Sequence, residues 1–323
     1  MGSFWKGKRV LVTGADGFMG SHLTERLVAA GAKVSVYIRG NSISGTVLYT
    51  LKHLQPLQKK LKNIITGNIA SLDSVSLIRK DAPAVIFHLA ADAYVPNSFD
   101  HPREVMESNL IGTMNVLDAT MGMKRIERVV CTSSSEIYGT ARYAPIDEAH
   151  PLNPTSPYAA SKVAADRIAY SYFTTYGLPV AIIRPFNTYG PRHTYDVIPK
   201  FIRLALENQP LTIYGNGRQS RDFTYVRDMI EAFLVMGADR HAIGRAVNFG
   251  TGHDVNMVDL ARLIKKLTGS RSEIIFIPKR KAEVQRLICD ARLAGRLFGW
   301  KPAYDIEQGL KENIQWARSC RAL

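Results

Sequence analysis

Residues 9–20 of this 323-residue chain read Arg9-Val10-Leu11-Val12-Thr13-Gly14-Ala15-Asp16-Gly17-Phe18-Met19-Gly20. The apolar run that ends at Thr13 predicts a buried strand, and the three glycines after it predict a tight turn that opens a helix. Gly14 suits the turn, Gly17 lets the backbone approach a ligand closely, and Gly20 lets the helix pack against the strand. A strand, a glycine turn and a helix in this order are typical of a pyrophosphate site. We therefore predict that this turn binds a dinucleotide cofactor.

Apolar runs recur through the first 184 residues, and amphipathic helical patterns separate most of them. The runs predict buried strands at residues 9–13, 33–38, 63–67, 84–90, 128–133 and 180–184. This alternation predicts an α/β fold, a Rossmann-type doubly wound parallel sheet. Ligands of such sheets bind at the carboxyl ends of the strands, and polar clusters fall there at residues 67–69, 88–91 and 132–136.

The pattern changes after Arg184, where segments rich in Pro and Gly, such as residues 185–191 and 213–217, alternate with short helical patterns. We predict a dinucleotide-binding domain over residues 1–184, to which residues 221–250 return. Residues 185–323 are then a smaller C-terminal substrate-binding region. The sequence contains no flexible linker, so we expect the two parts to pack together.

The composition favours a globular protein with a small anionic ligand. The chain is 46% hydrophobic, and no apolar stretch approaches the roughly 18 residues of a membrane span, so we expect a cytoplasmic protein with no membrane partner. Basic residues give a formal net charge of +14, but they are scattered and lack interleaved aromatic residues, so nucleic acid is not expected. Three cysteines without metal-ligand spacing predict a reducing compartment, no disulfide and no metal site; they are Cys131, Cys289 and Cys320.

The segment after the second predicted strand bears on the choice of cofactor. It reads Arg39-Gly40-Asn41-Ser42 and lacks the acidic residue that usually binds the adenosine ribose of NAD. An arginine with two short polar neighbours suits a 2′-phosphate. We therefore expect Arg39, Asn41 and Ser42 to favour NADP, with NAD as the alternative.

Tyr158 and Lys162 form the candidate catalytic pair. Ser156 can cap a helix and Pro157 suits its first turn, so Tyr158 and Lys162, four residues apart, share one helix face. A tyrosine with a pKa near 10 is only about 0.1% ionised at pH 7, and lowering that pKa by about three units requires roughly 4 kcal/mol. The lysine and an oxidised nicotinamide can supply this energy.

These features, in this order, resemble the extended short-chain dehydrogenase/reductase family, in particular its nucleotide-sugar 4,6-dehydratases, decarboxylases and epimerases. The resemblance covers nearly the whole chain and includes the glycine turn, the Tyr158–Lys162 pair and the segments 88–91, 134–139, 184–191 and 221–223. It implies a Rossmann domain with a small sugar-nucleotide domain, a nucleotide-sugar substrate and a homodimer.

The resemblance also implies which residues bind the ligands. Substrate phosphates would contact Asn187, Arg221 and Arg286. The cofactor would contact Gly14, Gly17, Phe18, Met19, Gly20, Asn68, Ile69, Leu89, Ala90, Ala91, Tyr158 and Lys162, together with Arg39, Asn41 and Ser42. Asn68 departs from the usual Asp of relatives, and the segment before Arg286 lacks their Pro-Gly turn.

The sequence Ser134-Ser135-Glu136 favours a 4,6-dehydratase within this family. Tyr158, assisted by Lys162 and Ser134, would remove the C4 hydroxyl proton during oxidation, and Glu136 would then remove the acidified C5 proton. Ser135 would orient the departing C6 hydroxyl. The alternatives are a UDP-glucuronate decarboxylase, a 4-epimerase and, from another class, a non-catalytic nucleotide-binding regulator.

Overall fold

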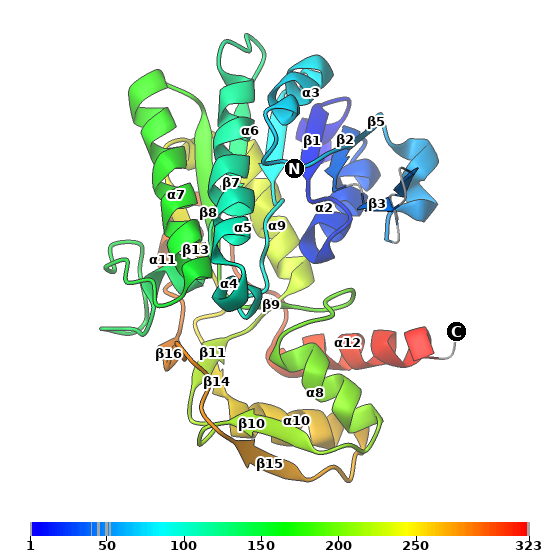
Figure 1. The fold of residues 1–323 in the computed structure, drawn as a ribbon, viewed down its shortest axis with the longest axis vertical. Helices are drawn as coiled ribbons and strands as arrows, with labels where there is room; N and C mark the ends of the chain where they lie inside the picture. Colours follow the sequence, from blue (N-terminus) through cyan, green and yellow to red (C-terminus); the bar gives the residue numbers. More distant parts are fainter. Residues whose placement is uncertain (1, 40, 44–45, 49–50, 52, 322–323) are drawn as a thin grey trace. The chain divides into compact units, whose positions relative to one another are not determined.

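The structure, a computed structural model, describes residues 2–39, 41–43, 46–48, 51 and 53–321 (Figure 1). The chain forms two compact units. Unit 1 comprises Met1–Ile137, Ser156–Arg184 and Ile230–Val247, and unit 2 comprises Tyr138–Thr155, Pro185–Met229 and Asn248–Leu323. The assignment of the cofactor to residues 1–184 and of the substrate to residues 185–323 stays a prediction.

A seven-stranded sheet organises unit 1, with the strand order β13-β8-β7-β6-β1-β2-β5. The strands are β1 (Arg9–Thr13), β2 (Lys33–Ile38), β5 (Asn63–Thr66), β6 (Val85–His88), β7 (Arg128–Thr132), β8 (Val180–Pro185) and β13 (Ala246–Phe249), the last of which ends in unit 2. The five pairings from β8 to β5 are parallel. Their carboxyl ends therefore lie at one end of the sheet, and the predicted Rossmann-type fold is confirmed.

Helices precede or connect these strands. They are α1 (Gly2–Trp5), α2 (Phe18–Ala29), α3 (Asp73–Asp81), α4 (Asn97–Asp100), α5 (Pro102–Met106), α6 (Gly112–Thr120), α7 (Pro157–Tyr176) and α9 (Val226–Ala238). A π-helix spans Glu107–Ile111, and 3₁₀ helices span Gln55–Lys60, Ser135–Tyr138 and Arg240–Ala242. A short antiparallel pair, β3 (Asn41–Ile43) and β4 (Thr46–Leu48), follows β2.

Helices cover both faces of the sheet. Two neighbouring residues of β6 show this, because successive residues of a strand point to opposite faces. Ile86 belongs to a buried cluster that includes Val116 of α6 and Ala169 of α7. The next residue, Phe87, instead contacts Phe233 of α9, with 6.4 Å between the ring centroids. The sheet is thus doubly wound, as the alternation of the sequence predicts.

Among the described residues, unit 2 is built from short strands, four complete helices and the first turn of α9. The strands pair as β9 (Thr188–Tyr189) with β12 (Thr224–Tyr225), β10 (Leu211–Tyr214) with β15 (Ile274–Ile277), and β14 (Asp254–Asn256) and β16 (Arg286–Leu287) on either side of β11 (Ser220–Asp222). The helices are α8 (Val197–Leu206), α10 (Met257–Thr268), α11 (Arg292–Phe298) and α12 (Ile306–Arg321).

A buried carboxylate organises the centre of unit 2. Asp222, at the end of β11, accepts hydrogen bonds from the N–H groups of Thr251 and Gly252, both at 2.8 Å, and of Cys289 at 3.1 Å. These bonds tie the segments at residues 251–252 and 289 to the side chain at the end of β11.

In the described ranges, no helix is both long and apolar enough to cross a bilayer.

Candidate active site

The glycine turn between β1 and α2 has the backbone shape that its sequence predicts. Gly14 has a φ of +67°, and a Cβ on Gly20 would collide with the carbonyl O of Gly14. Gly17 is the N-cap of α2 and has no side chain with which to cap it. The first N–H groups of an α-helix, which here include those of Phe18 and Met19, lie outside the helix's own repeating hydrogen-bond pattern. Such N–H groups, at the positive end of the helix dipole, fit a pyrophosphate.

The predicted adenosine end of this site follows β2 and β5. Arg39 is exposed directly after β2. Asn41 and Ser42 lie in β3, but their side chains are outside the described part of the chain. Beyond β5, the side-chain oxygen of Asn68 accepts the N–H two residues later at 3.1 Å, and Ile69 is buried.

Two unpaired hydroxyls mark the end of β7. Oγ1 of Thr132 and Oγ of Ser133 are buried and have no hydrogen-bond partner within the described residues. Most buried hydroxyls in proteins are paired, so these two fit the polar edge of a bound ligand. At the same end of the sheet, the half-buried segment Leu89, Ala90 and Ala91 follows β6.

The candidate catalytic pair lies in the first two turns of α7. Ser156 is the N-cap of this helix and its Oγ accepts the N–H of Ala159 at 3.1 Å, which confirms the predicted helix start. Tyr158 and Lys162 are both buried. Nζ of Lys162 donates to the carbonyl O of Thr132 at 3.0 Å, and burial lowers the pKa of Lys162 to about 8.

Ser134, Ser135 and Glu136 follow β7 in the same unit as this pair. Oγ of Ser134 accepts the N–H of Glu136 at 3.2 Å. Ser135 is buried and Glu136 is half-buried, in a 3₁₀ helix that starts at Ser135. Unit 1 thus holds all five residues that the sequence proposes for catalysis.

The predicted substrate residues all lie in unit 2, two of them on adjacent strands. Ser220, which precedes Arg221 in β11, pairs with Arg286 of β16. Arg221 is buried and donates to the carbonyl O of Ser220 at 2.9 Å and of Val284 at 2.8 Å. Asn187 has a buried side-chain oxygen without a hydrogen-bond partner among the described residues.

Arg286 is already paired in this structure. Its Nε and Nη2 donate to the two carboxylate oxygens of Asp254 at 2.8 and 3.2 Å. Burial opposes ionisation of Asp254, but hydrogen bonds from Arg286 and Ser220 hold the pKa of its carboxyl below the usual range. In the segment before β16, Ala282 has a φ of +51°, so the turn keeps a glycine-like backbone without the glycine.

Four buried polar residues lie near the carboxyl end of the sheet; the sequence predicts a place at the site only for His88, within residues 88–91, and assigns none of the four a chemical role. Thr13 and Thr113 lie on either side of the His88 ring, and Asn109 lies in the π-helix. A histidine at the end of an apolar strand is a signal that sequence reading can detect. The π-helix that places Asn109 has no such signal, because it depends on a local change in backbone hydrogen bonding.

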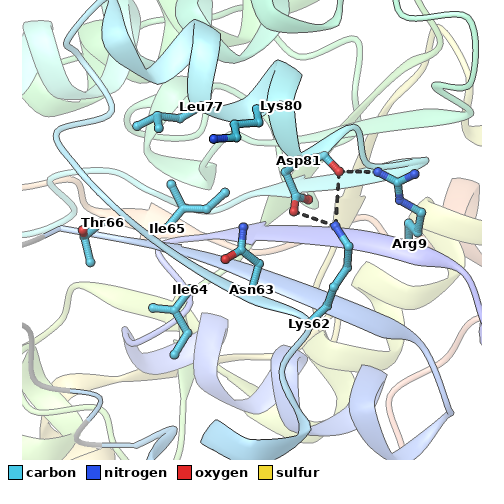
Figure 2. Close-up of a pocket in the computed structure, with 9 residues that line it drawn as sticks. All are labelled: Arg9, Lys62, Asn63, Ile64, Ile65, Thr66, Leu77, Lys80 and Asp81. Atoms are coloured by element: carbon cyan, nitrogen blue, oxygen red, sulfur yellow. Dashed lines mark hydrogen bonds and ion pairs between the residues drawn. The ribbon is translucent and has the colours of Figure 1, made fainter.

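A cavity of about 500 Å³ is lined by none of the candidate site residues (Figure 2). It is lined by β5, the end of α3, and the side chains of Arg9 and Lys62. Nζ of Lys62 forms an ion pair with the buried carboxylate of Asp81 at 2.7 Å. The side chains of Arg9 and Lys62 both donate hydrogen bonds to the backbone carbonyl O of Asp81. These contacts join strands β1 and β5 to α3.

Within the described ranges, no group of three or more His, Cys, Asp or Glu residues is arranged to hold a metal ion.

Comparison with known proteins identifies relatives that match nearly the whole of this chain. The family model of GDP-mannose 4,6 dehydratase matches residues 11–313. A putative UDP-glucose 4-epimerase of Methanocaldococcus jannaschii is 34% identical over 315 residues, which cover 96% of this chain and 98% of that protein. UDP-glucuronic acid decarboxylase 1 of Xenopus tropicalis is 33% identical over 323 residues, 96% of this chain and 72% of that protein.

Dehydratases are also among the relatives. The trifunctional UDP-glucose 4,6-dehydratase/UDP-4-keto-6-deoxy-D-glucose 3,5-epimerase/UDP-4-keto-L-rhamnose-reductase RHM2 of Arabidopsis thaliana is 36% identical over 322 residues, 97% of this chain but 47% of that protein. The dTDP-glucose 4,6-dehydratase DesIV of Streptomyces venezuelae, solved with NAD bound, has a TM-score of 0.88 and 29% identity, over 97% of this chain and 98% of that one. Because the family match spans almost the whole chain and these relatives share nucleotide-sugar chemistry, the chain belongs to the dehydratase, epimerase and decarboxylase group of extended short-chain dehydrogenases/reductases.

Proposed function

We propose that this chain is a nucleotide-sugar 4,6-dehydratase that forms a 4-keto-6-deoxy sugar nucleotide. The observation that carries the proposal is Glu136, a half-buried carboxylate directly after β7 in the unit that also holds Tyr158 and Lys162. Oxidation of the sugar at C4 makes the C5 proton acidic, and elimination of the C6 hydroxyl needs a base to remove that proton. Epimerisation at C4 needs no such base.

Tyr158 is proposed to remove the proton of the C4 hydroxyl. The positive charge of Lys162 favours the phenolate, and its pKa of about 8 leaves most Lys162 side chains charged at pH 7. Ser134 assists by hydrogen bonding to the same hydroxyl. A nicotinamide cofactor, when bound, would supply the hydride acceptor for oxidation at C4 and the hydride donor for reduction at C6.

Glu136 and Ser135 are proposed to carry out the elimination. Glu136 takes the C5 proton, the electron pair of that bond forms the C5–C6 double bond, and the C6–O bond breaks. Ser135 orients the C6 hydroxyl, which leaves as water after it receives a proton from Glu136 or from a solvent water. Hydride addition at C6 would then leave an enolate that takes up a proton at C5, and this proton balances the one that Tyr158 removes from the C4 hydroxyl.

The ligand contacts are proposed along the same lines. The pyrophosphate of the cofactor would lie on the N–H groups at the start of α2, and the unpaired hydroxyls of Thr132 and Ser133 support a polar ligand at the end of β7. The substrate phosphates would contact Arg221, Arg286 and Asn187. The unpaired side-chain oxygen of Asn187 supports its part in this site.

We propose NADP as the preferred cofactor because Arg39, and no acidic residue, follows β2. A guanidinium forms charge-assisted hydrogen bonds with a 2′-phosphate. NAD, which is bound in the DesIV structure, is the alternative.

A homodimer in the cytoplasm remains our expectation. In α7, Tyr170 and Tyr176 are 40% and 55% exposed, and these apolar rings are suited to a helix-mediated contact between two copies. Sedimentation equilibrium of the purified protein decides between monomer and dimer.

The first experiment is mass spectrometry of the purified protein with a panel of nucleotide sugars. A loss of about 18 mass units indicates dehydration, loss of carbon dioxide indicates the decarboxylase alternative, and an isomer of unchanged mass indicates an epimerase. The decarboxylase named among the relatives makes UDP-glucuronic acid an essential member of the panel.

Glu136→Gln gives the sharper test of the mechanism. This variant should still reduce part of the bound cofactor, visible as absorbance of the reduced nicotinamide, because oxidation at C4 does not need a C5 base. It should release little dehydrated product, and exchange of the C5 hydrogen with deuterated water should fall. Elimination at the parent rate would make Glu136 a structural residue and remove the main support for a dehydratase.

A further inference from the structure

The ring of His88, the last residue of β6, is buried between two threonines. Nδ1 lies 2.8 Å from Oγ1 of Thr13 at the end of β1, and Nε2 lies 3.1 Å from Oγ1 of Thr113 in α6. Burial and the nearby charge of Lys162 lower the pKa of the ring to about 3. A neutral imidazole carries one proton, so one nitrogen donates and the other accepts.

The surrounding hydrogen bonds decide which nitrogen carries that proton. The hydroxyl of Thr113 lies 2.6 Å from the carbonyl O of Asn109, which can only accept, so the proton of Thr113 points there. Thr113 therefore accepts from His88, which places the ring proton on Nε2. Nδ1 then accepts the hydroxyl proton of Thr13, whose oxygen accepts the N–H of Ala90 at 3.1 Å. In the opposite tautomer, Nε2 of His88 would accept the hydroxyl proton of Thr113. The 2.6 Å contact between Oγ1 of Thr113 and the carbonyl O of Asn109 would then have no proton.

The same chain of hydrogen bonds reaches the start of α7. Nδ2 of Asn109 donates to Oγ of Ser161 at 2.9 Å, and Ser161 donates to the carbonyl O of Tyr158 at 2.7 Å. The carboxamide of Asn109 also accepts the N–H of Asp92 and donates to the carbonyl O of Asp92, in the segment that follows β6. From the N–H of Ala90 to the carbonyl O of Asn109 the hydrogen bonds are all donated in one direction, and the side chain of Asn109 then continues the chain to Ser161.

We propose that His88 is a positioning residue that, fixed as its Nε2–H tautomer, holds the segment after β6 between the cofactor turn and the helix of Tyr158. On the cofactor side there is little room for movement, because a Cβ on Gly14 would lie 2.8 Å from the N of Ala90. On the other side the chain ends on the backbone of Tyr158 itself. The effect on turnover rests on the proposed function, in which Tyr158 is the acid–base group.

The tautomer is measured directly by NMR of the full-length protein labelled with ¹⁵N in its histidine rings. The signal that is lost in His88→Gln identifies His88. We expect a neutral ring with the proton on Nε2 at pH 7, and a charged ring or a proton on Nδ1 would overturn the proposal. This experiment uses no substrate, so its result does not depend on which reaction the protein catalyses.

The positioning role is tested by two matched valine variants in α6. Thr113→Val removes the partner of His88, whereas Thr120→Val removes a buried hydroxyl that donates only to the carbonyl O of Leu117 within the hydrogen bonds described. For the reaction that mass spectrometry identifies, Thr113→Val should lower kcat by about tenfold or more while KM changes by less than about threefold. Thr120→Val should stay close to the parent, and Thr113→Ser should recover most of kcat.

Equal losses in Thr113→Val and Thr120→Val, or a change confined to KM, would overturn the positioning role. If no nucleotide sugar is dehydrated by the parent protein, the proposed function fails instead, and the NMR experiment still decides the tautomer. The two failures are therefore distinguishable.

Discussion

At the scale of single residues, the proposed acid–base pair of Tyr158 and Lys162 can be tested by removing one hydroxyl. Lys162 is buried, and its ammonium is oriented by the carbonyl O of Thr132. Replacing Tyr158 with Phe keeps the ring and removes only the hydroxyl. We expect turnover to fall by at least about 10²-fold, the typical contribution of a positioned acid–base group, with the cofactor Kd within about threefold of the parent. Near-normal turnover in single-turnover measurements would show that another residue accepts the C4 proton.

Arg39 offers a second test at this scale because it is exposed and follows β2 directly. Arg39→Asp should favour NAD over NADP, since a carboxylate repels a 2′-phosphate and accepts hydrogen bonds from ribose hydroxyls. The relative affinity should shift by about 1.5–3 kcal/mol, the contribution of a charged hydrogen bond. Calorimetry with both cofactors measures this shift, with Arg39→Gln as the control that removes charge without adding a carboxylate. Equal affinity of the parent for NAD and NADP would remove the basis of this prediction.

Helix ends show how an element can tolerate an unfavourable residue. Ala82 ends α3 with a φ of +48° and a ψ of 58°, a left-handed conformation in which a Cβ is unfavourable by roughly 1 kcal/mol. Ala82→Gly should therefore raise the free energy of unfolding by about 0.5–1 kcal/mol, measured by urea denaturation. Ala29→Gly, at the exposed last residue of α2, should lower the stability because its backbone is helical. The same sign for both variants would contradict the role of backbone conformation.

The elements also show how far sequence reading extends. The bounds of β1 and β2 agree with the predicted runs, because their apolar residues are buried locally between helix layers. The strand β13 is missed, since its four residues include the polar Asn248, and residues 185–229, which belong to unit 2, separate it in the sequence from its neighbour β8. The glycine turn and the capped start of α7 are local and were predictable. The contacts of His88 and Asn109 join segments far apart in sequence and were not.

At the scale of the whole molecule, His88 should make folding sensitive to mild acid. Its pKa is about 3 in the folded protein and near 6.5 in an unfolded chain, so between these values the unfolded state binds a proton that the folded state does not. Stability therefore falls as the pH falls below about 6.5, by about 2 kcal/mol at pH 5. The carboxylates with lowered pKa, including Asp166 and Asp254, add to this loss only at lower pH.

Urea unfolding of the parent at several pH values from 6.5 to 5 measures this loss. His88→Gln should be less stable at pH 6.5, because it disturbs the bonds to Thr13 and Thr113, yet its stability should change little over the same range. His253→Gln is the matched control, since this histidine is exposed and should leave the parent's slope in place. A parent-like slope in His88→Gln would mean that the folded protein accepts a charged ring at this position. The neutral ring on which the directed hydrogen bonds depend would then be ruled out.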